Sequence, residues 1–258
     1  MNQTLDLINN RISLRRYADR PVTDIDLNTI IEGAMRAPTA GNMMNYSIIV
    51  VKDEEKKKRL SETCDNQPFI AKAPVVLIFL ADIQRLYDYF DFCEVEKFCK
   101  EKEMDFKEPN MANLFLAASD AFIAAQNAVI AAESINIGSC YIGDIVENYE
   151  IHKELLKLHD RVFPVAMLTL GYYPENIKRI KRSRFDKKYI VFNEEYRLLE
   201  DEYLKEMYKE LEEDLANKDK KGARNYGQYL YERKFGVEFF NEMERSIELM
   251  IKHWKGNV

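Results

Sequence analysis

Residues 74–81 read Pro-Val-Val-Leu-Ile-Phe-Leu-Ala, an apolar run without a single polar side chain. Residues 46–51, Tyr-Ser-Ile-Ile-Val-Val, form a second run that is rich in β-branched side chains. Runs of this length and composition are typical of strands that are covered on both faces. Because both runs stand between longer segments with helical spacing, the sequence predicts a sheet sandwiched between helical layers.

The remaining elements follow from periodicity and from helix-ending residues. We expect helices over residues 2–12, 25–37, 53–63, 83–108, 111–137 and 148–159, the second of them capped by Thr23 or Asp24. Further strands are expected at residues 139–142, 164–170 and 189–192, and Gly138 is expected to end the helix before them. Residues 193–258 look mainly helical, with Trp254 as an anchor of the last helix.

Nine alanines within residues 112–132 distinguish the most apolar of these helices. Small side chains let another helix approach closely, so we read this helix as central and as a candidate subunit interface. Polar residues interrupt it, which argues against a segment that spans a membrane.

Composition excludes several classes of protein. The chain has 258 residues, 47% of them hydrophobic, and a formal net charge of −6. That apolar fraction argues against disorder, and the acidic balance argues against nucleic-acid binding. The first residues show no secretory pattern, and the four cysteines form no metal-binding spacing, so we expect a cytoplasmic protein with free thiols and no metal.

Three separated clusters could meet around one anion. Arg11, Ser13 and Arg15 alternate, so on an extended segment they would face one side and match phosphate oxygens. Arg182 and Arg184 repeat the spacing in a basic loop, and residues 138–144 form a strand bracketed by glycines. Each cluster alone has a simpler reading: surface arginines are usually solvated, and Gly138 could be only a helix cap.

Together the clusters resemble the FMN-dependent nitroreductase family. The matching motifs are Arg-x-Ser-x-Arg-x-Tyr at residues 11–17, Pro-Thr-x-x-Asn at 38–42, Gln67, Gly-x-x-Tyr-Ile-Gly at 138–143, Leu-Gly-Tyr-x-Pro at 170–174, and Arg-Ser-Arg at 182–184. Their order spans roughly residues 8–196. One position departs from the pattern, because Met44-Asn45 stands where a Gln-Pro pair is common.

The resemblance implies a three-layer α+β fold whose central sheet is mixed but mainly antiparallel. Residues 1–196 would form the FMN-binding domain, and residues 197–258 would form a helical extension that packs on the same domain or on a partner subunit. The implied cofactor contacts are Arg11, Ile12, Ser13, Arg15, Pro38, Thr39, Asn42, Gln67, Tyr141, Ile142, Gly143, Arg182 and Arg184.

Individual roles follow from the same resemblance. Arg11, Ser13 and Arg15 would hold the phosphate and the pyrimidine edge, and Arg182 and Arg184 would close on the phosphate or the ribityl chain. Thr39 and Asn42 would reach the flavin of the partner subunit in a homodimer, and Gln67 would contact the ring or ribityl hydroxyls. Tyr141, Ile142 and Gly143 would line the ring, with the Gly143 amide as the candidate donor to flavin N5.

The implied activity is an NAD(P)H-dependent oxidoreductase that reduces nitroaromatics, quinones or flavins by two-electron ping-pong transfer, without a catalytic side chain. NADPH or NADH would be the co-substrate, and Lys220, Lys221 and Arg224 are available for the extra phosphate of NADPH. The alternatives are a flavoprotein that stores FMN without turnover and a related FMN enzyme with a dedicated substrate, such as a dehalogenase-like protein.

Overall fold

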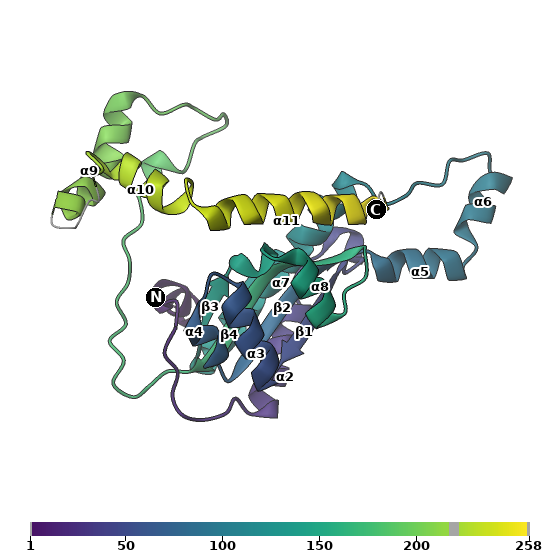
Figure 1. Cartoon of the computed structure of the whole chain (residues 1–258), viewed down its shortest axis with the longest axis horizontal. Helices are drawn as coiled ribbons and strands as arrows, with labels where there is room; N and C mark the ends of the chain where they lie inside the picture. The colour runs from purple at the N-terminus through teal and green to yellow at the C-terminus, as the bar shows by residue number, and fades with distance from the viewer. Residues whose placement is uncertain (1, 217–221, 257–258) are drawn as a thin grey trace. The chain divides into compact units, whose positions relative to one another are not determined.

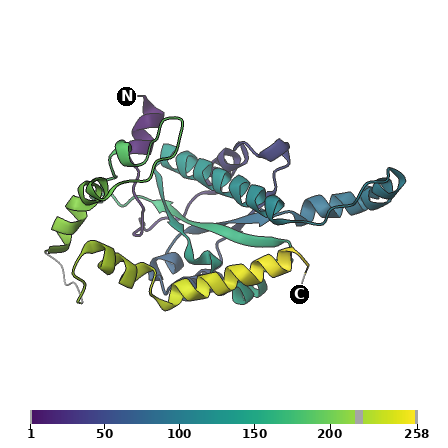
Figure 2. The ribbon, with the colours of Figure 1, turned by 90° about the horizontal axis from the view of Figure 1, so that it is seen from above.

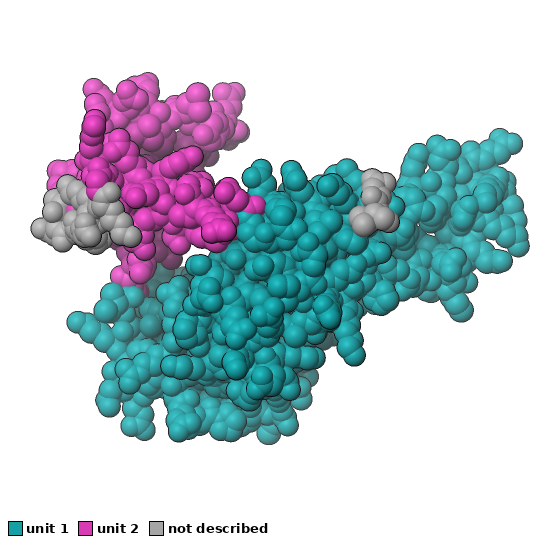
Figure 3. All heavy atoms as spheres, viewed as in Figure 1, with its two compact units in different colours: residues 1–180, 242–258 teal, residues 181–241 magenta. Residues whose placement is uncertain are grey.

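The computed structural model of the chain describes residues 2–216 and 222–256. The chain divides into two compact units, one of residues 1–180 with 242–258 and the other of residues 181–241 (Figure 3). The division falls inside the last helix, α11 (Glu238–Trp254). The sheet and the helices that cover it belong to the first unit.

Within the described residues, four strands form one sheet in the order β1-β2-β4-β3, with every neighbouring pair antiparallel (Figure 1). The bounds are β1 (Tyr46–Val51), β2 (Val75–Asp82), β3 (Ile137–Ile142) and β4 (Val162–Tyr172). Every residue of the two central strands, β2 and β4, is buried, which explains their long apolar runs. An isolated parallel bridge joins Ser13 to Ser139 at the β3 edge, so the sheet is mainly antiparallel, as predicted.

Alternate residues of β2 pack into two separate hydrophobic cores. Leu77 and Phe79 pack with α2 (Asp24–Met35) and α7 (Met111–Ser134), which runs along one side of the sheet in Figure 2. Val76 and Ile78 pack on the opposite face, where the covering helices are α3 (Glu54–Thr63), α4 (Pro68–Ala71) and α8 (Tyr149–Leu156). The three layers confirm the predicted α+β fold.

Shorter elements complete both units. The first unit also contains α1 (Gln3–Asn10), η1 (Ala40–Asn42), α5 (Gln84–Phe92), α6 (Val95–Glu101) and η2 (Asp144–Val146). The second contains η3 (Lys187–Tyr189), α9 (Asp201–Ala216), α10 (Tyr226–Lys234) and the first residues of α11. The side chain of Trp254 is fully buried and its indole donates to the Asn110 carbonyl at 3.2 Å, so it does anchor the last helix.

The helix predicted over residues 83–108 is wrong as a single element. It breaks at Glu94, whose φ of 53° lies in the left-handed region, and this break separates α5 from α6. The chain after α6 then returns to α5, because Phe106 packs against Tyr87 with ring centroids 6.1 Å apart. A continuous helix would have carried Phe106 away from that contact.

Two other predicted elements also differ from the structure. Helix α7 ends at Ser134, and the left-handed residue that follows it is Asn136 rather than Gly138, which lies inside β3. Residues 189–192 form no strand: Tyr189 closes the short turn η3, and the residues after it are irregular. An isolated segment of this length needs a neighbouring strand before it can form a ladder.

Helix α7 is the one helix among the described residues whose length and hydropathy match a membrane span. Its alanines, however, are fully buried at positions 117, 121, 124 and 128, where it packs on α2 and the sheet. The core helix of a globular domain meets the same length and hydropathy criteria, and these contacts identify α7 as such a helix.

Candidate functional site

The segment from Arg11 to Tyr17 lies along the open edge of β3. The Leu14 amide donates to the Ser139 carbonyl at 2.9 Å, beside the bridge between Ser13 and Ser139. Leu14 is buried, whereas Ser13 and Arg15 on either side of it are exposed. The predicted alternation is therefore present, with two hydrophilic side chains turned away from the core.

Two paired glycines make room for this segment. Gly138 of β3 stands opposite Gly171 of β4 in the sheet. A Cβ atom on Gly138 would lie 2.6 Å from Leu14 Cδ2, and one on Gly171 would lie 2.5 Å from Tyr17 Cδ1. Because real Cβ atoms do not approach other atoms so closely, only glycine allows the segment to pack against the sheet.

Positive charge gathers where this segment meets β3. Burial raises the pKa of the Cys140 thiol, and the nearby Arg15, Ser13 and Arg11 act in the opposite direction. Arg11 is half-buried, and within the described residues its Nε atom is enclosed without a hydrogen-bond partner. An enclosed donor of this kind is suited to an anionic ligand.

The end of β3 presents an open turn. Ile142 is buried and Tyr141 is half-buried, with burial raising the pKa of the Tyr141 phenol to about 12. Gly143 is exposed, and a Cβ atom built on it would meet no atom within 4 Å. The backbone at Gly143 is thus accessible to a flat ligand.

Gln67 joins this turn from a distant part of the chain. Its side-chain nitrogen donates to the Cys64 carbonyl at 3.0 Å and to Asp144 Oδ2 at 2.7 Å. The bond to Asp144 holds Gln67, the residue before α4, next to the residue that follows Gly143. The structure therefore brings Gln67 and the Gly143 turn together.

Thr39 and Asn42 lie elsewhere in the same unit. They belong to the turn before β1, and β1 and β3 form opposite edges of the sheet. Within the turn, the Thr39 hydroxyl accepts the Met44 amide at 3.3 Å. Within one chain, Thr39 and Asn42 therefore lie at the sheet edge opposite the segment with Arg11. A site that two subunits share requires this separation.

Met44 lines a pocket of about 490 Å³ beside this turn. Its neighbours are mostly apolar, and Arg85 donates to the Met44 and Tyr46 carbonyls at 2.6 and 3.0 Å. Met44 itself has a φ of 53°, an unusual conformation for a residue with a side chain.

Arg182 and Arg184 belong to the second unit. Arg182 is exposed, and Arg184 lines a pocket of about 430 Å³ with Phe185, Tyr189 and Glu206. Their approach to the segment with Arg11 stays a prediction. Of the residues suggested for NADPH, Lys220 and Lys221 lie outside the described residues, and Arg224 is exposed, just before α10.

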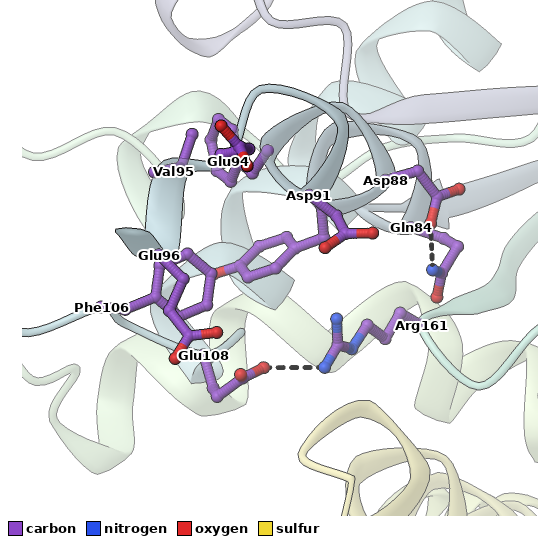
Figure 4. A pocket seen from close by; sticks show the side chains of 11 residues that line it. Gln84, Asp88, Asp91, Glu94, Val95, Glu96, Phe106, Glu108 and Arg161 are labelled. Atoms are coloured by element: carbon purple, nitrogen blue, oxygen red, sulfur yellow. Dashed lines mark hydrogen bonds and ion pairs between the residues drawn. The ribbon is translucent and has the colours of Figure 1, made fainter. Parts of the chain in front are cut away.

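A further pocket, of about 300 Å³, lies between α5, α6 and the chain that follows them (Figure 4). Tyr87 and Phe106 are among its lining residues, together with the ion pair of Arg161 with Glu108 at 2.7 Å. None of the predicted site residues lines it. It is therefore separate from the candidate cofactor site.

Sequence reasoning missed several polar residues next to the candidate site. They are Asp120, whose carboxylate accepts the amides of Ala40 and Asn45, and the group of Cys140, Asp144 and Glu147 around the end of β3. The one available signal was the position of Asp144 directly after Gly143. The other contacts join residues that are far apart in sequence.

Comparison with known proteins agrees with this arrangement. Residues 8–172 match the model of the Nitroreductase family. The chain is 33% identical over 245 residues to the FMN reductase (NAD(P)H) of Bacillus subtilis (strain 168), covering 91% of this chain and 93% of the relative. It is 32% identical over 205 residues to the FMN reductase (NADPH) of the same organism, covering 79% and 78%.

Solved structures extend the likeness to the whole chain. NfrA1 of B. megaterium superposes with a TM-score of 0.76 at 30% identity, covering 96% of this chain and 98% of that one. The family match includes the segment with Arg11, Gln67 and all four strands. This chain belongs to the nitroreductase family.

Proposed function

We propose that this protein is an FMN-dependent oxidoreductase that takes two electrons from NAD(P)H and passes them to nitroaromatics, quinones or flavins in a ping-pong cycle. The observation that carries the proposal is the row of Arg11, Ser13 and Arg15 beside the open Gly143 turn. This arrangement offers cations for a phosphate next to bare backbone for a flat ring.

The residues present fit FMN. The enclosed Nε atom of Arg11 and the exposed side chains of Ser13 and Arg15 would hold the phosphate and the pyrimidine edge. Ile12, Tyr141, Ile142 and Gly143 would line the ring, with the Gly143 amide directed at N5. Bound FMN supplies the redox chemistry, and the protein supplies position and charge.

The cations have a second effect in this proposal. Two-electron reduction leaves additional negative charge on a flavin, and Arg11 or Arg15 beside the ring would stabilise it. Arg182 and Arg184 would close on the phosphate or ribityl chain. No side chain of the protein needs to act as a nucleophile or as a dedicated base.

The proposed site is shared between two copies of the chain. Thr39 and Asn42, with Pro38 before them, would reach the flavin of the partner subunit. Helix α7 supports this reading because it leaves large apolar side chains exposed, namely Met111, Phe115, Leu116, Phe122 and Ile123. Residues 197–258 would pack on the same domain or on the partner.

We place the enzyme in the cytoplasm, which suits its free cysteines at positions 64, 93, 99 and 140. NADPH is the favoured co-substrate, and NADH is the alternative. Charge reversal at Arg224 tests this preference: NADPH should lose efficiency while NADH should not. If NADPH and NADH are used with equal efficiency by both the wild type and the variant, Arg224 has no role in selecting NADPH.

An anaerobic absorption spectrum of the FMN-loaded protein tests the proposal directly. The flavin band should bleach when NAD(P)H is added and should return when a nitroaromatic or quinone is added. A yellow protein that is indifferent to NAD(P)H would instead indicate FMN storage. Bleaching without recovery by any of these acceptors would indicate a dedicated substrate.

A further inference from the structure

The side-chain amide of Gln67 has a defined orientation. Its nitrogen lies 3.0 Å from the Cys64 carbonyl oxygen and 2.7 Å from Asp144 Oδ2. A carbonyl accepts hydrogen bonds and cannot donate them, and a carboxylate does likewise, so both partners require the NH₂ group of the amide. The amide oxygen of Gln67 is therefore the atom that remains for another partner.

A buried acid lies beside Asp144. Glu147 is 4% exposed, and within the described residues its Oε1 atom has no hydrogen-bond partner. Burial, followed by the charge of Asp144, raises the pKa of Glu147 to about 8. At neutral pH Glu147 thus carries a proton.

Charged and titratable groups surround Glu147 on every side. Cys64 and Asp65 face it from the end of α3, His152 faces it from α8, and Glu242 faces it from α11. Arg245 pairs with Glu242 at 2.8 Å and holds the pKa of that acid at about 2. Burial and the acids Asp144, Asp65 and Glu242, which act most strongly on Glu147, all favour its protonated form.

We propose that Asp144, backed by Glu147, is a positioning residue that fixes Gln67 with its amide oxygen turned toward the flavin. The inference rests on the proposed function, because it needs an FMN ring at Gln67. An oxidised isoalloxazine carries a single ring N–H, which is its imide, and a fixed acceptor would select that edge. The residue acts through Gln67 and does not itself touch the cofactor.

Two consequences separate this role from a merely structural one. Without Asp144, the Gln67 amide keeps only one of its two acceptors and can turn its NH₂ group to the ring. Above pH 8, Glu147 loses its proton and places a second negative charge beside Asp144. FMN is an anion, so its affinity should fall as the pH rises through 8.

The test is an FMN titration of the flavin-stripped full chain, followed by quenching of flavin fluorescence. We expect Asp144→Ala to raise the Kd about tenfold, the effect of losing one hydrogen bond between Gln67 and the flavin. Gln67→Ala should raise it similarly, and the double variant should be no worse than either single one. Asp144→Asn keeps an acceptor oxygen for Gln67 and should raise the Kd less than Asp144→Ala does. If the alanine variant fails to fold, Asp144→Leu, which has a similar size and no acceptor, replaces it.

The pH arm uses Glu147→Gln, which cannot ionise. In wild type the Kd should rise several-fold between pH 7 and 9, and in the variant that step should be absent. Asp91→Asn, an exposed acid on α5, is the matched control and should behave as wild type.

Each outcome has a distinct meaning. Additive losses in the double variant, or the same pH step in Glu147→Gln as in wild type, would overturn the inference while leaving FMN binding intact. If the wild-type chain binds no FMN at any pH, the cofactor assignment itself is wrong and the inference falls with it.

Discussion

The carboxylate of Asp120 in α7 accepts the backbone amide of Ala40 at 2.9 Å, across 80 residues of sequence. Its second oxygen accepts the amide of Asn45 at 3.3 Å. The side chain is 2% exposed, so this buried charge is compensated by the turn that contains Thr39 and Asn42. One acid of α7 thus shapes a turn that is proposed to reach the partner's flavin.

Replacing Asp120 by alanine should loosen that turn. Two backbone amides would lose their acceptor, so we expect the free energy of unfolding to fall by about 1–3 kcal/mol. Urea unfolding followed by circular dichroism measures the change, and Ser119→Ala on the same helix is the control. Equal unfolding midpoints in urea for the two variants would show that the turn is stable without the Asp120 carboxylate.

The close packing at Gly138 gives a second prediction. Gly138→Ala should push Leu14 away from β3 and cost about 1–3 kcal/mol, because its Cβ would also lie 2.7 Å from the Tyr173 ring. Gly143→Ala is the matched control, since its Cβ meets open space and its φ of −78° suits any residue. We expect its unfolding free energy to stay within about 0.5 kcal/mol of wild type. A normal stability for Gly138→Ala, with FMN binding intact, would show that the segment can shift freely.

How much the sequence could predict depends on the range of the interactions. The strand β2 was predictable because burial on both faces imposes an apolar run on the chain itself. The run at residues 46–51 also predicted a strand, but the expectation that it is covered on both faces is wrong: β1 is an edge strand whose middle residues are only partly buried, with Val50 exposed. The break at Glu94 was not, because the packing of Phe106 on Tyr87 decides it and helical periodicity continues past that point. Local sequence patterns do not indicate that the chain turns back at this point.

The candidate site shows the same limit. The alternation of Arg11, Ser13 and Arg15 is visible in the sequence because neighbouring residues create it. Gly138 was read as a helix end, since a glycine after a helix usually is one, whereas its actual requirement comes from Leu14. The bond between Gln67 and Asp144 spans 77 residues and depends on how two loops meet.

Removal of one cation should weaken FMN binding. Arg15→Ala is expected to raise the Kd about 10- to 100-fold, the loss of a hydrogen bond between charged groups, and to lower the reduction potential. The Kd of Arg15→Lys should fall between those of wild type and Arg15→Ala. Lysine keeps the positive charge but loses the paired N–H donors of the guanidinium group. Arg16→Ala is the control, since Arg16 is a neighbouring exposed cation to which no cofactor contact is assigned. Full flavin content with an unchanged potential in Arg15→Ala would contradict the role given to Arg15.

Buried His152 predicts how stability depends on pH. Its side chain is fully buried between the Ile145 carbonyl and the Thr63 hydroxyl, and burial lowers its pKa from 6.5 to about 4. The unfolded chain therefore binds this proton first, so stability is lost as the pH falls from about 6.5 to 4, by up to about 3 kcal/mol. Urea unfolding at several pH values measures the slope. His152→Gln should flatten it; an unchanged slope would assign the acid sensitivity to other groups.

The exposed face of α7 gives the test of assembly. Phe115 is 74% exposed and Phe122 is 48% exposed, although both belong to the most apolar helix of the chain. If this face joins two copies, Phe115→Glu would bury an unpaired charge in the interface, and the protein should sediment as a monomer.

That variant should also lose FMN, because Thr39 and Asn42 would no longer reach the flavin of a partner. The control is Lys58→Glu on α3, which changes charge on the opposite helical layer and should leave both properties unaltered. A stable monomer that keeps stoichiometric FMN would mean that a single chain builds the whole site. Thr39 and Asn42 would then have no part in it, since they lie at the β1 edge of the sheet and the segment with Arg11 lies at the β3 edge.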